Sequence, residues 1–146
     1  MRKMKKSMVI GLFGLMVSIS SCAQEAEMEN VKKTIKAFAS AGDFNDANEL
    51  EKCLDDNYRI VMNRLFGSNE VTIMTKSLYL EKIRSKEFGG DSREVTFKYV
   101  IINGNTACAQ VTLKGSKMTL VSLITLVKDA EGNWKLVSDI PTVSNS

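Results

Sequence analysis

The side chains that could do chemistry in this chain are carboxylates, tyrosines and cysteines, because its 146 residues include no histidine. A Ser-His-Asp or Cys-His catalytic unit is therefore excluded, and so are the usual imidazole metal sites. The segment from Asp43 to Asp46 offers oxygen ligands, but it lacks the Gly and Glu positions of an EF-hand loop, and capping explains it better. The sequence also has no Cys-x-x-Cys motif. We therefore expect no metal, no cofactor and no redox centre.

Cys22 follows a segment that is typical of secreted proteins. Four basic residues within residues 2–6 precede an uncharged apolar run from Met8 to Ile19, which is too short to cross a bilayer as a permanent helix. The sequence from Ile19 to Cys22 resembles the lipobox of bacterial lipoproteins, in which the cysteine is lipid-modified and becomes the first mature residue. We expect a signal peptide over residues 1–21, a lipidated Cys22 that anchors the chain to a membrane, and a short tether over residues 22–26. The expected location is the cell envelope, periplasmic or at the outer membrane.

Removal of this leader changes the net charge. Residues 1–21 contain four of the 20 basic residues and none of the 17 acidic ones, so the remaining chain has a net charge of −1. The remaining chain is therefore not basic, and no phosphate-binding motif G-x-x-x-x-G-K-[ST] occurs in it. We expect no nucleic-acid partner.

The other two cysteines, Cys53 and Cys108, lie far apart in the sequence. The expected compartment permits a disulfide, but sequence does not show whether the two residues lie within bonding distance. Buried free thiols are the preferred interpretation.

The first half of the chain that remains after the leader is predicted to contain three helices and two short strands. Residues 25–40 place Val31, Ile35, Phe38 and Ala39 at helical spacing, and Gly42 is a plausible stop. Asp43 is expected to cap a second, short helix. Asp55 and Asp56 are expected to lead from the end of this helix into a turn. Two short strands follow over residues 58–64 and 70–75, and Thr75 is expected to cap a third helix over residues 76–85.

The second half is predicted to form an antiparallel meander of four strands. The strand-like runs cover residues 93–102, 105–113, 117–128 and 134–140, and Asn103-Gly104 is a strong hairpin signal. The third run is apolar on both faces, with Met118, Leu120, Ile124 and Leu126 on one side and Val121, Leu123 and Val127 on the other. Helices can cover one face, while a second subunit or the bend of the sheet must cover the other. We expect a homodimer formed through the sheet.

Three stretches, LDDNYRIVMN, MTKSLYLEKI and EGNWKLVSDI, carry a resemblance to the nuclear transport factor 2-like (NTF2-like) cone, in particular to its lumazine-binding-like branch in secreted bacterial proteins. The resemblance covers roughly Ala37 to Ile140. It implies one α+β domain over residues 27–143, in which N-terminal helices pack on a curved antiparallel β-sheet. It also implies a pocket at the wide end of the cone.

The expected function is therefore non-catalytic binding of a small ligand or of a protein partner. The ligand-binding candidates are Tyr58, Arg59, Tyr99, Trp134 and Asp139. Arg59 could bind a carboxylate or phosphate through two hydrogen bonds, although a surface position is the plainer interpretation. Trp134 reads as part of the core. A third alternative is an interaction module whose pocket is filled by side chains such as Phe97, Trp134 and Leu136.

An enzyme like ketosteroid isomerase or the polyketide cyclases is the rival interpretation. Such sites hold an Asp, Tyr or His in a dry pocket, where burial raises a carboxyl pKa or a phenol donates to an oxyanion. The candidates here are Asp139, Tyr58, Tyr99 and Asp56. Strand alternation places Asp139 on the same face as Lys135, which predicts a solvated face in place of an active site.

Overall fold

The computed structural model describes residues 14–144, with side chains described from residue 21 onward. Three helices and six strands follow one another along the chain. They are α1 (Gly14–Asp43), α2 (Ala47–Cys53), β1 (Leu54–Asn63), β2 (Val71–Thr75), α3 (Lys76–Arg84), β3 (Glu94–Asn103), β4 (Thr106–Lys114), β5 (Thr119–Lys128) and β6 (Trp134–Ser144). Within the described residues, no helix is long and apolar enough to cross a membrane.

Helix α1 contains the segment that the sequence predicts to be helical, and it extends further toward the N-terminus. Val31, Ile35, Phe38 and Ala39 are all buried, which confirms the predicted apolar face. The expected tether, residues 22–26, is helical here, and Cys22 is exposed. Most of the expected signal peptide lies outside the described residues, and its cleavage stays a prediction.

Asp46 caps helix α2, and Asp43 does not. The Glu49 backbone N–H donates to Asp46 Oδ1 over 3.0 Å, while Asp43 is still the last residue of α1. The prediction for Asp43 was therefore wrong by three residues. The expected turn at Asp55 and Asp56 was also wrong, because both residues lie in β1. The prediction for α3 is confirmed, since Thr75 Oγ1 accepts from the Leu78 N–H at its first turn.

The six strands form one sheet in the order β2-β1-β6-β5-β4-β3. The expected meander from β3 to β6 is confirmed, and Gly104 with a φ of 58° forms the tight turn between Asn103 and Thr106. The pairing of β1 with β6 is parallel, so the sheet is mixed and not wholly antiparallel as expected. This parallel pair joins the two halves of the chain into one α+β domain.

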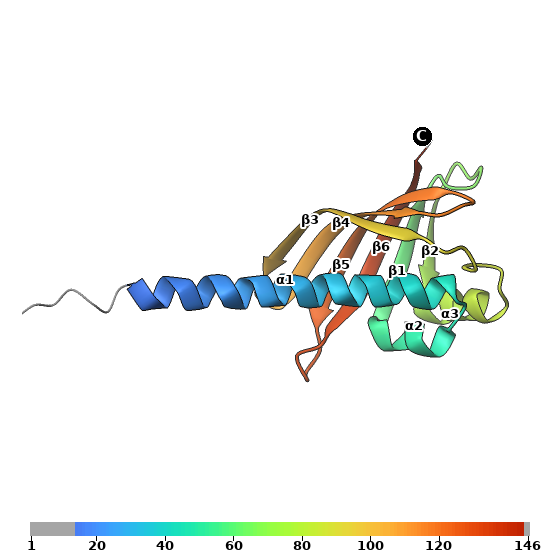
Figure 1. Cartoon of the computed structure of the whole chain (residues 1–146). Helices are drawn as coiled ribbons and strands as arrows, with labels where there is room; N and C mark the ends of the chain where they lie inside the picture. The colour runs from blue at the N-terminus through green and yellow to red at the C-terminus, as the bar shows by residue number, and fades with distance from the viewer. Residues whose placement is uncertain (1–13, 145–146) are drawn as a thin grey trace, which may run out of the picture.

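The helices cover one face of the curved sheet (Figure 1). Helix α1 runs across the strands, and α2 and α3 lie together at the end of the sheet formed by β1 and β2. The side chains of β4 and β5 alternate, so Val111, Leu113, Ile124 and Leu126 are buried beneath the helices. We call this covered side the concave face and the opposite side the convex face.

The convex face carries exposed apolar side chains. Leu123 lies opposite Ile140 on β6 and opposite Gln110 on β4, and Gln110 lies opposite Tyr99 on β3. Leu123, Ile140 and Tyr99 are all exposed, Leu123 by 46%. This confirms the expectation that the strand over residues 117–128 is apolar on both faces. No element in the described part of this chain covers its convex face.

Candidate functional site

A cavity of about 360 Å³ opens on the concave face, at the end of the domain where α1 stops. Its walls come from the C-terminal half of α1, from α3 and from the facing strands β1, β4, β5 and β6. Most of the lining is apolar. It includes Phe38, Ile60, Met62, Tyr79, Ile83, Phe88, Leu113, Leu120 and Pro141, together with the charged residues Asp139 and Arg93. The combination of an apolar wall with few polar groups is typical of small-molecule sites.

Three loops form the rim of the cavity, and side-chain hydrogen bonds hold two of them in place. Asn45 Nδ2 donates to the carbonyl oxygens of Ile83 and Phe88, which ties the loop after α3 to the end of α1. The Asp91 carboxylate accepts from the backbone N–H groups of Ser116 and Lys117, which fixes the β4–β5 turn. The third loop, between β1 and β2, contributes Leu65 and the exposed Phe66.

A β-bulge in β6 places Asp139 in the cavity wall. Thr125 pairs with Ser138, but its neighbour Leu126 pairs with Leu136, so Val137 is an extra residue in β6. An extra residue reverses the alternation of the strand beyond it. Asp139 consequently joins Leu136 on the concave face and is only 6% exposed. The prediction of a solvated face shared with Lys135 was wrong for this reason.

Asp139 belongs to a group of three buried polar side chains on the concave face, which we call the polar cluster: Tyr58, Ser122 and Asp139. Asp139 pairs with Ile124 on β5 and with Ile60 on β1, and the other two members lie two residues from these partners. Tyr58 is 2% exposed and Ser122 is fully buried. No group in the described residues hydrogen-bonds Tyr58 Oη, Ser122 Oγ or Asp139 Oδ1. Buried polar atoms without partners are rare and costly, which marks this cluster as a candidate binding site.

Burial dominates the protonation behaviour of the cluster. It raises the pKa of the Asp139 carboxyl from 3.8 to about 6, and the nearby Ser122 hydroxyl and Arg93 guanidinium act in the opposite direction. Burial also raises the pKa of Tyr58 well above its ordinary value of 10, and the negative charge of Asp139 adds to this. The pKa of Tyr79 is raised by the same two causes, in the same order. Both phenols therefore stay neutral at physiological pH. Asp139 changes its charge near the lower end of the physiological pH range.

Aromatic rings surround the polar cluster. The ring centroids of Tyr58 and Tyr79 lie 5.8 Å apart, and each lies 6.3 Å from the centroid of Phe38. Phe88 continues the series, 6.4 Å from Tyr79. These separations are typical of tilted aromatic pairs, and they make one side of the cavity an aromatic wall.

Arg93 also lines the cavity, but its charge is satisfied by α1. Its Nε donates to Asp43 Oδ1 over 2.5 Å, its backbone N–H donates to Asp43 Oδ2 over 2.9 Å, and its Nη2 donates to the Ala39 carbonyl over 3.2 Å. Both side chains are largely buried, with 14% of Arg93 and 7% of Asp43 exposed. This pair locks the end of α1 to the start of β3.

The structure brings together two of the five predicted site residues and separates the other three. Tyr58 and Asp139 are neighbours in the polar cluster. Trp134 is buried away from the cavity, where its Nε1–H donates to Glu27 of α1 over 2.9 Å, which agrees with its interpretation as a core residue. Tyr99 lies on the convex face, and Arg59 is exposed beside a shallow hollow between β1 and α3.

Sequence reasoning missed Ser122, Tyr79 and Arg93. Ser122 interrupts an otherwise apolar face of β5, and a polar residue at such a position could have been noticed. Tyr79 lies on α3, and its position in the cavity wall depends on the packing of α1 against the same space. Nothing in the local sequence indicates that Arg93 pairs with Asp43, which lies 50 residues away.

The remaining predictions about reactive groups can be compared directly with the structure. Cys53 and Cys108 are both free thiols, as expected, and Cys53 is buried whereas Cys108 is half-buried. Among the described residues, no group of three or more Cys, Asp or Glu side chains is arranged to hold a metal ion. The cavity lining combines apolar side chains with Asp139, Arg93 and the charged rim residues Glu87, Asp91 and Lys117.

A six-stranded curved sheet closed by helices on its concave face, with a cavity at its open end, defines an NTF2-like domain. The family model described as "Putative lumazine-binding" matches residues 26–140, and the chain belongs to this family. Among curated proteins, none matches this chain.

Solved structures show the same fold at low sequence identity. An NTF2-like protein of unknown function from Shewanella baltica is 17% identical over 83% of this chain and 96% of its own, with a TM-score of 0.71. One from Silicibacter pomeroyi is 15% identical over 83% of this chain and 98% of its own, with a TM-score of 0.72. An NTF2-like protein from Cytophaga hutchinsonii is 20% identical over 80% of this chain and 98% of its own, with a TM-score of 0.63.

Proposed function

We propose that this protein is a membrane-anchored lipoprotein whose NTF2-like domain binds a small, largely apolar molecule in the cavity and does not transform it. One observation carries the binding proposal: a cavity of about 360 Å³ with aromatic walls contains a buried carboxylate oxygen that no described residue satisfies. A ligand that fills the cavity buries apolar surface and supplies the missing hydrogen bond. The name of the family suggests a flat, nitrogen-containing ring system as one candidate ligand.

Native mass spectrometry of the purified full chain tests the binding proposal. We expect a small molecule to co-purify with the protein and to be lost from Met62→Trp, because Met62 lines the cavity and the larger ring fills it. Val71→Trp is the matched control, since Val71 is exposed on β2 and lies outside the cavity lining. An adduct that both variants retain equally would contradict the cavity as the binding site.

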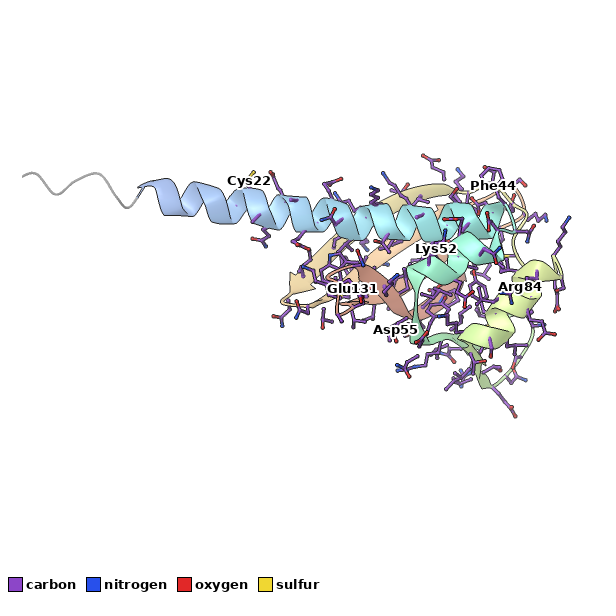
Figure 2. All side chains as sticks on the ribbon, turned by 90° about the horizontal axis from the view of Figure 1, so that it is seen from below. Cys22, Phe44, Lys52, Asp55, Arg84 and Glu131 are labelled. Carbon is purple, nitrogen blue, oxygen red and sulfur yellow. The ribbon has the colours of Figure 1, made fainter. Side chains whose placement is uncertain are left out.

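The proposed lipid anchor rests on the sequence around Cys22, and its position in the structure is compatible with it. Cys22 is exposed on the part of α1 that extends past the sheet (Figure 2). Acyl chains on this thiol would contribute about 0.8 kcal/mol per buried CH₂ to membrane binding, and two or more chains give stable anchoring. Cys22→Ala is expected to abolish metabolic labelling of the protein with an alkyne fatty acid and to release it from the membrane fraction. A Cys22→Ala variant that is still labelled would refute the anchor.

The second candidate function is that of an isomerase or cyclase that uses Asp139 as a general base. The observation in its favour is the pKa of about 6 that burial gives this carboxyl, which suits proton transfer near neutral pH. Tyr79, whose ring also lines the cavity, would then donate to the developing oxyanion.

Isomerisation of a β,γ-unsaturated ketone, followed by ultraviolet absorbance, separates the two candidates. An enzyme of this kind would show turnover that falls by about 100-fold or more in Asp139→Asn. The binding proposal predicts no difference in the conversion rate between wild type, Asp139→Asn and buffer.

The homodimer expected from the apolar convex face stays a proposal. Leu123 and Ile140 form a directly opposed apolar pair at the centre of this face, with Tyr99 two strands away from Leu123. A second copy of the chain, placed face to face, would cover these side chains and leave the cavity open, because the cavity lies on the concave side.

A further inference from the structure

Most of the charged groups around the cavity have partners, and Lys117 at the rim adds a positive charge close to Asp91. Arg93 is neutralised by Asp43, and Asp91 at the rim accepts hydrogen bonds from the β4–β5 turn. Glu87 at the rim pairs with Lys82, which lies outside the lining. Among the described residues that line the cavity, Asp139 is a buried carboxylate that forms no ion pair.

An ionised carboxylate in this position needs more compensation than the described residues supply, because burial outweighs the effects of the Ser122 hydroxyl and the Arg93 guanidinium on its pKa. Its Oδ1 accepts no hydrogen bond from them, and the Arg93 guanidinium directs its Nε toward Asp43. Burying a charge without a partner is expensive, whereas pairing it with an N–H cation forms a hydrogen bond about twice as strong as a neutral one. The missing partner at Asp139 is therefore best supplied by a ligand that carries a positive charge.

The walls near Asp139 also favour a cation with an apolar body. Phe38 and Tyr79 line the cavity and pack against Tyr58 of the polar cluster, with centroid separations of 5.8–6.3 Å among the three rings, and Phe88 extends this wall toward the rim. The faces of aromatic rings attract cations in addition to burying hydrocarbon. An anionic ligand would meet both the negative ring faces and the Asp139 carboxylate, so the same walls disfavour it.

We propose that the cavity binds a small apolar cation, an amine or amidine on a ring-sized hydrocarbon body, whose N–H group donates to Asp139. This inference rests on the proposed ligand-binding function and specifies the chemistry of the ligand. The aromatic wall holds the body of the ligand, and Asp139 holds its charged end.

The pairing makes binding depend on pH. The groups that face Asp139 are Tyr58 from β1, Tyr79 from α3, Ser122 from β5, and Arg93, which precedes β3 and is bonded to Asp43 of α1. The two phenols have raised pKa values and stay neutral, so Asp139, whose pKa is about 6, is the acid among these groups that changes its charge in this pH range. Affinity for a cation is expected to rise between pH 5 and pH 7.5.

Calorimetry with two matched probes tests the inference. The probes are 1-naphthylmethylamine, which is cationic at pH 7.5, and its neutral isostere 1-naphthylmethanol, both titrated into the full chain. We expect the amine to bind about tenfold or more tightly than the alcohol, because a hydrogen bond to a charged group contributes more than one between neutral groups. The preference is expected to shrink as the pH falls from 7.5 to 5.

Variants assign the preference to Asp139. Asp139→Asn is expected to remove the preference for the amine while the alcohol still binds. Asp56→Asn is the control, because Asp56 undergoes the same change on a side chain that is 98% exposed and outside the cavity lining. If Asp139→Asn does not fold, the pH dependence of the wild-type preference still decides the question.

The outcomes separate the inference from the function on which it rests. Equal binding of both probes, or an amine preference that Asp139→Asn retains, would overturn the cation inference and leave the cavity as a binding site for neutral molecules. If neither probe binds, the inference is overturned as well. The proposed binding function is then tested separately, by native mass spectrometry of the co-purifying molecule.

Discussion

Asp139 lies directly opposite Ile124 in the β5–β6 ladder, and both side chains are buried on the concave face of the sheet. Regular alternation from Trp134 would place Asp139 on the other face. The extra residue at Val137 is what turns the carboxylate into the core. A bulge of one residue therefore decides whether this domain has a buried acid in its cavity.

The first prediction concerns the pH dependence of stability. The pKa of Asp139 in the folded protein, about 6, lies above the ordinary value of 3.8, so the folded state binds the proton more tightly than the unfolded state. The stability that this group contributes is fully present below about pH 3.8 and is lost as the pH rises toward 6. The total loss is on the order of 3 kcal/mol.

The variant Asp139→Asn isolates this effect from the other carboxylates. The difference in the free energy of unfolding, variant minus wild type, is expected to increase by on the order of 3 kcal/mol between pH 3.5 and pH 7. Urea denaturation at intervals of half a pH unit measures it. A difference that stays constant with pH would mean that Asp139 is not a buried, perturbed acid.

The second prediction concerns the ion pair between Arg93 and Asp43. Asp43→Asn leaves the buried guanidinium without its anionic partner, and we expect a loss of about 3 kcal/mol in the free energy of unfolding. Glu49→Gln is the control, because its pair with Lys52 is mostly exposed, and it should cost less than about 1 kcal/mol. Equal effects in chemical denaturation would show that the Arg93 pair does not hold α1 on the sheet.

The third prediction compares two glycines with nearly the same backbone conformation. Gly89 and Gly132 have φ values of 82° and 85°, so alanine is strained at both. A Cβ at Gly89 would also collide with the Gly42 carbonyl at the cavity rim, whereas a Cβ at Gly132 would meet nothing within 4 Å. Gly132→Ala is expected to cost about 1 kcal/mol, and Gly89→Ala at least about 1 kcal/mol more.

Thermal denaturation and ligand binding together check this comparison. Because Gly42 and Gly89 both line the cavity, Gly89→Ala is also expected to weaken binding of the co-purifying molecule, while Gly132→Ala leaves it unchanged. Identical melting temperatures for the two variants would contradict the close packing at the rim.

The fourth prediction concerns the convex face. Leu123→Asp places a charge at the centre of the apolar row and is expected to convert a dimer into a monomer, because burying an unpaired charge is costly. Val71→Asp makes the same kind of change at an exposed residue on the edge strand β2 and should leave the dimer intact. Sedimentation velocity gives the answer. An unchanged and equally stable assembly of Leu123→Asp would refute the proposed interface.

Local signals made most of the helices and strands predictable. The apolar spacing of α1, the Thr75 cap of α3 and the Asn103-Gly104 turn each depend on residues that are close together in the sequence. The resemblance to the NTF2-like cone then supplied the arrangement of these elements. The cap of α2 was misplaced because Asp43 and Asp46 are both good capping residues, and a distant ion pair with Arg93 decides between them.

The site was less predictable because it depends on register and on contacts between distant elements. Alternation assigns Asp139 to a face only if β6 is regular, and no residue near Val137 indicates a bulge. Tyr58 was identified as a site residue, but Ser122 lies 64 positions later, and the β1–β6–β5 pairing places the two on opposite sides of Asp139. Tyr99 lies on the convex face because a second bulge, at Lys98, reverses the alternation of β3.

The most direct test of the buried acid in the cavity is the carbon-13 NMR titration of the Asp139 side-chain carboxyl in the wild-type protein. The signal can be assigned by its absence from Asp139→Asn. The structure predicts a titration midpoint at a pH of about 6. A midpoint near the ordinary value of 3.8 would show that water reaches Asp139 freely, and it would contradict the buried site on which the proposed ligand binding depends.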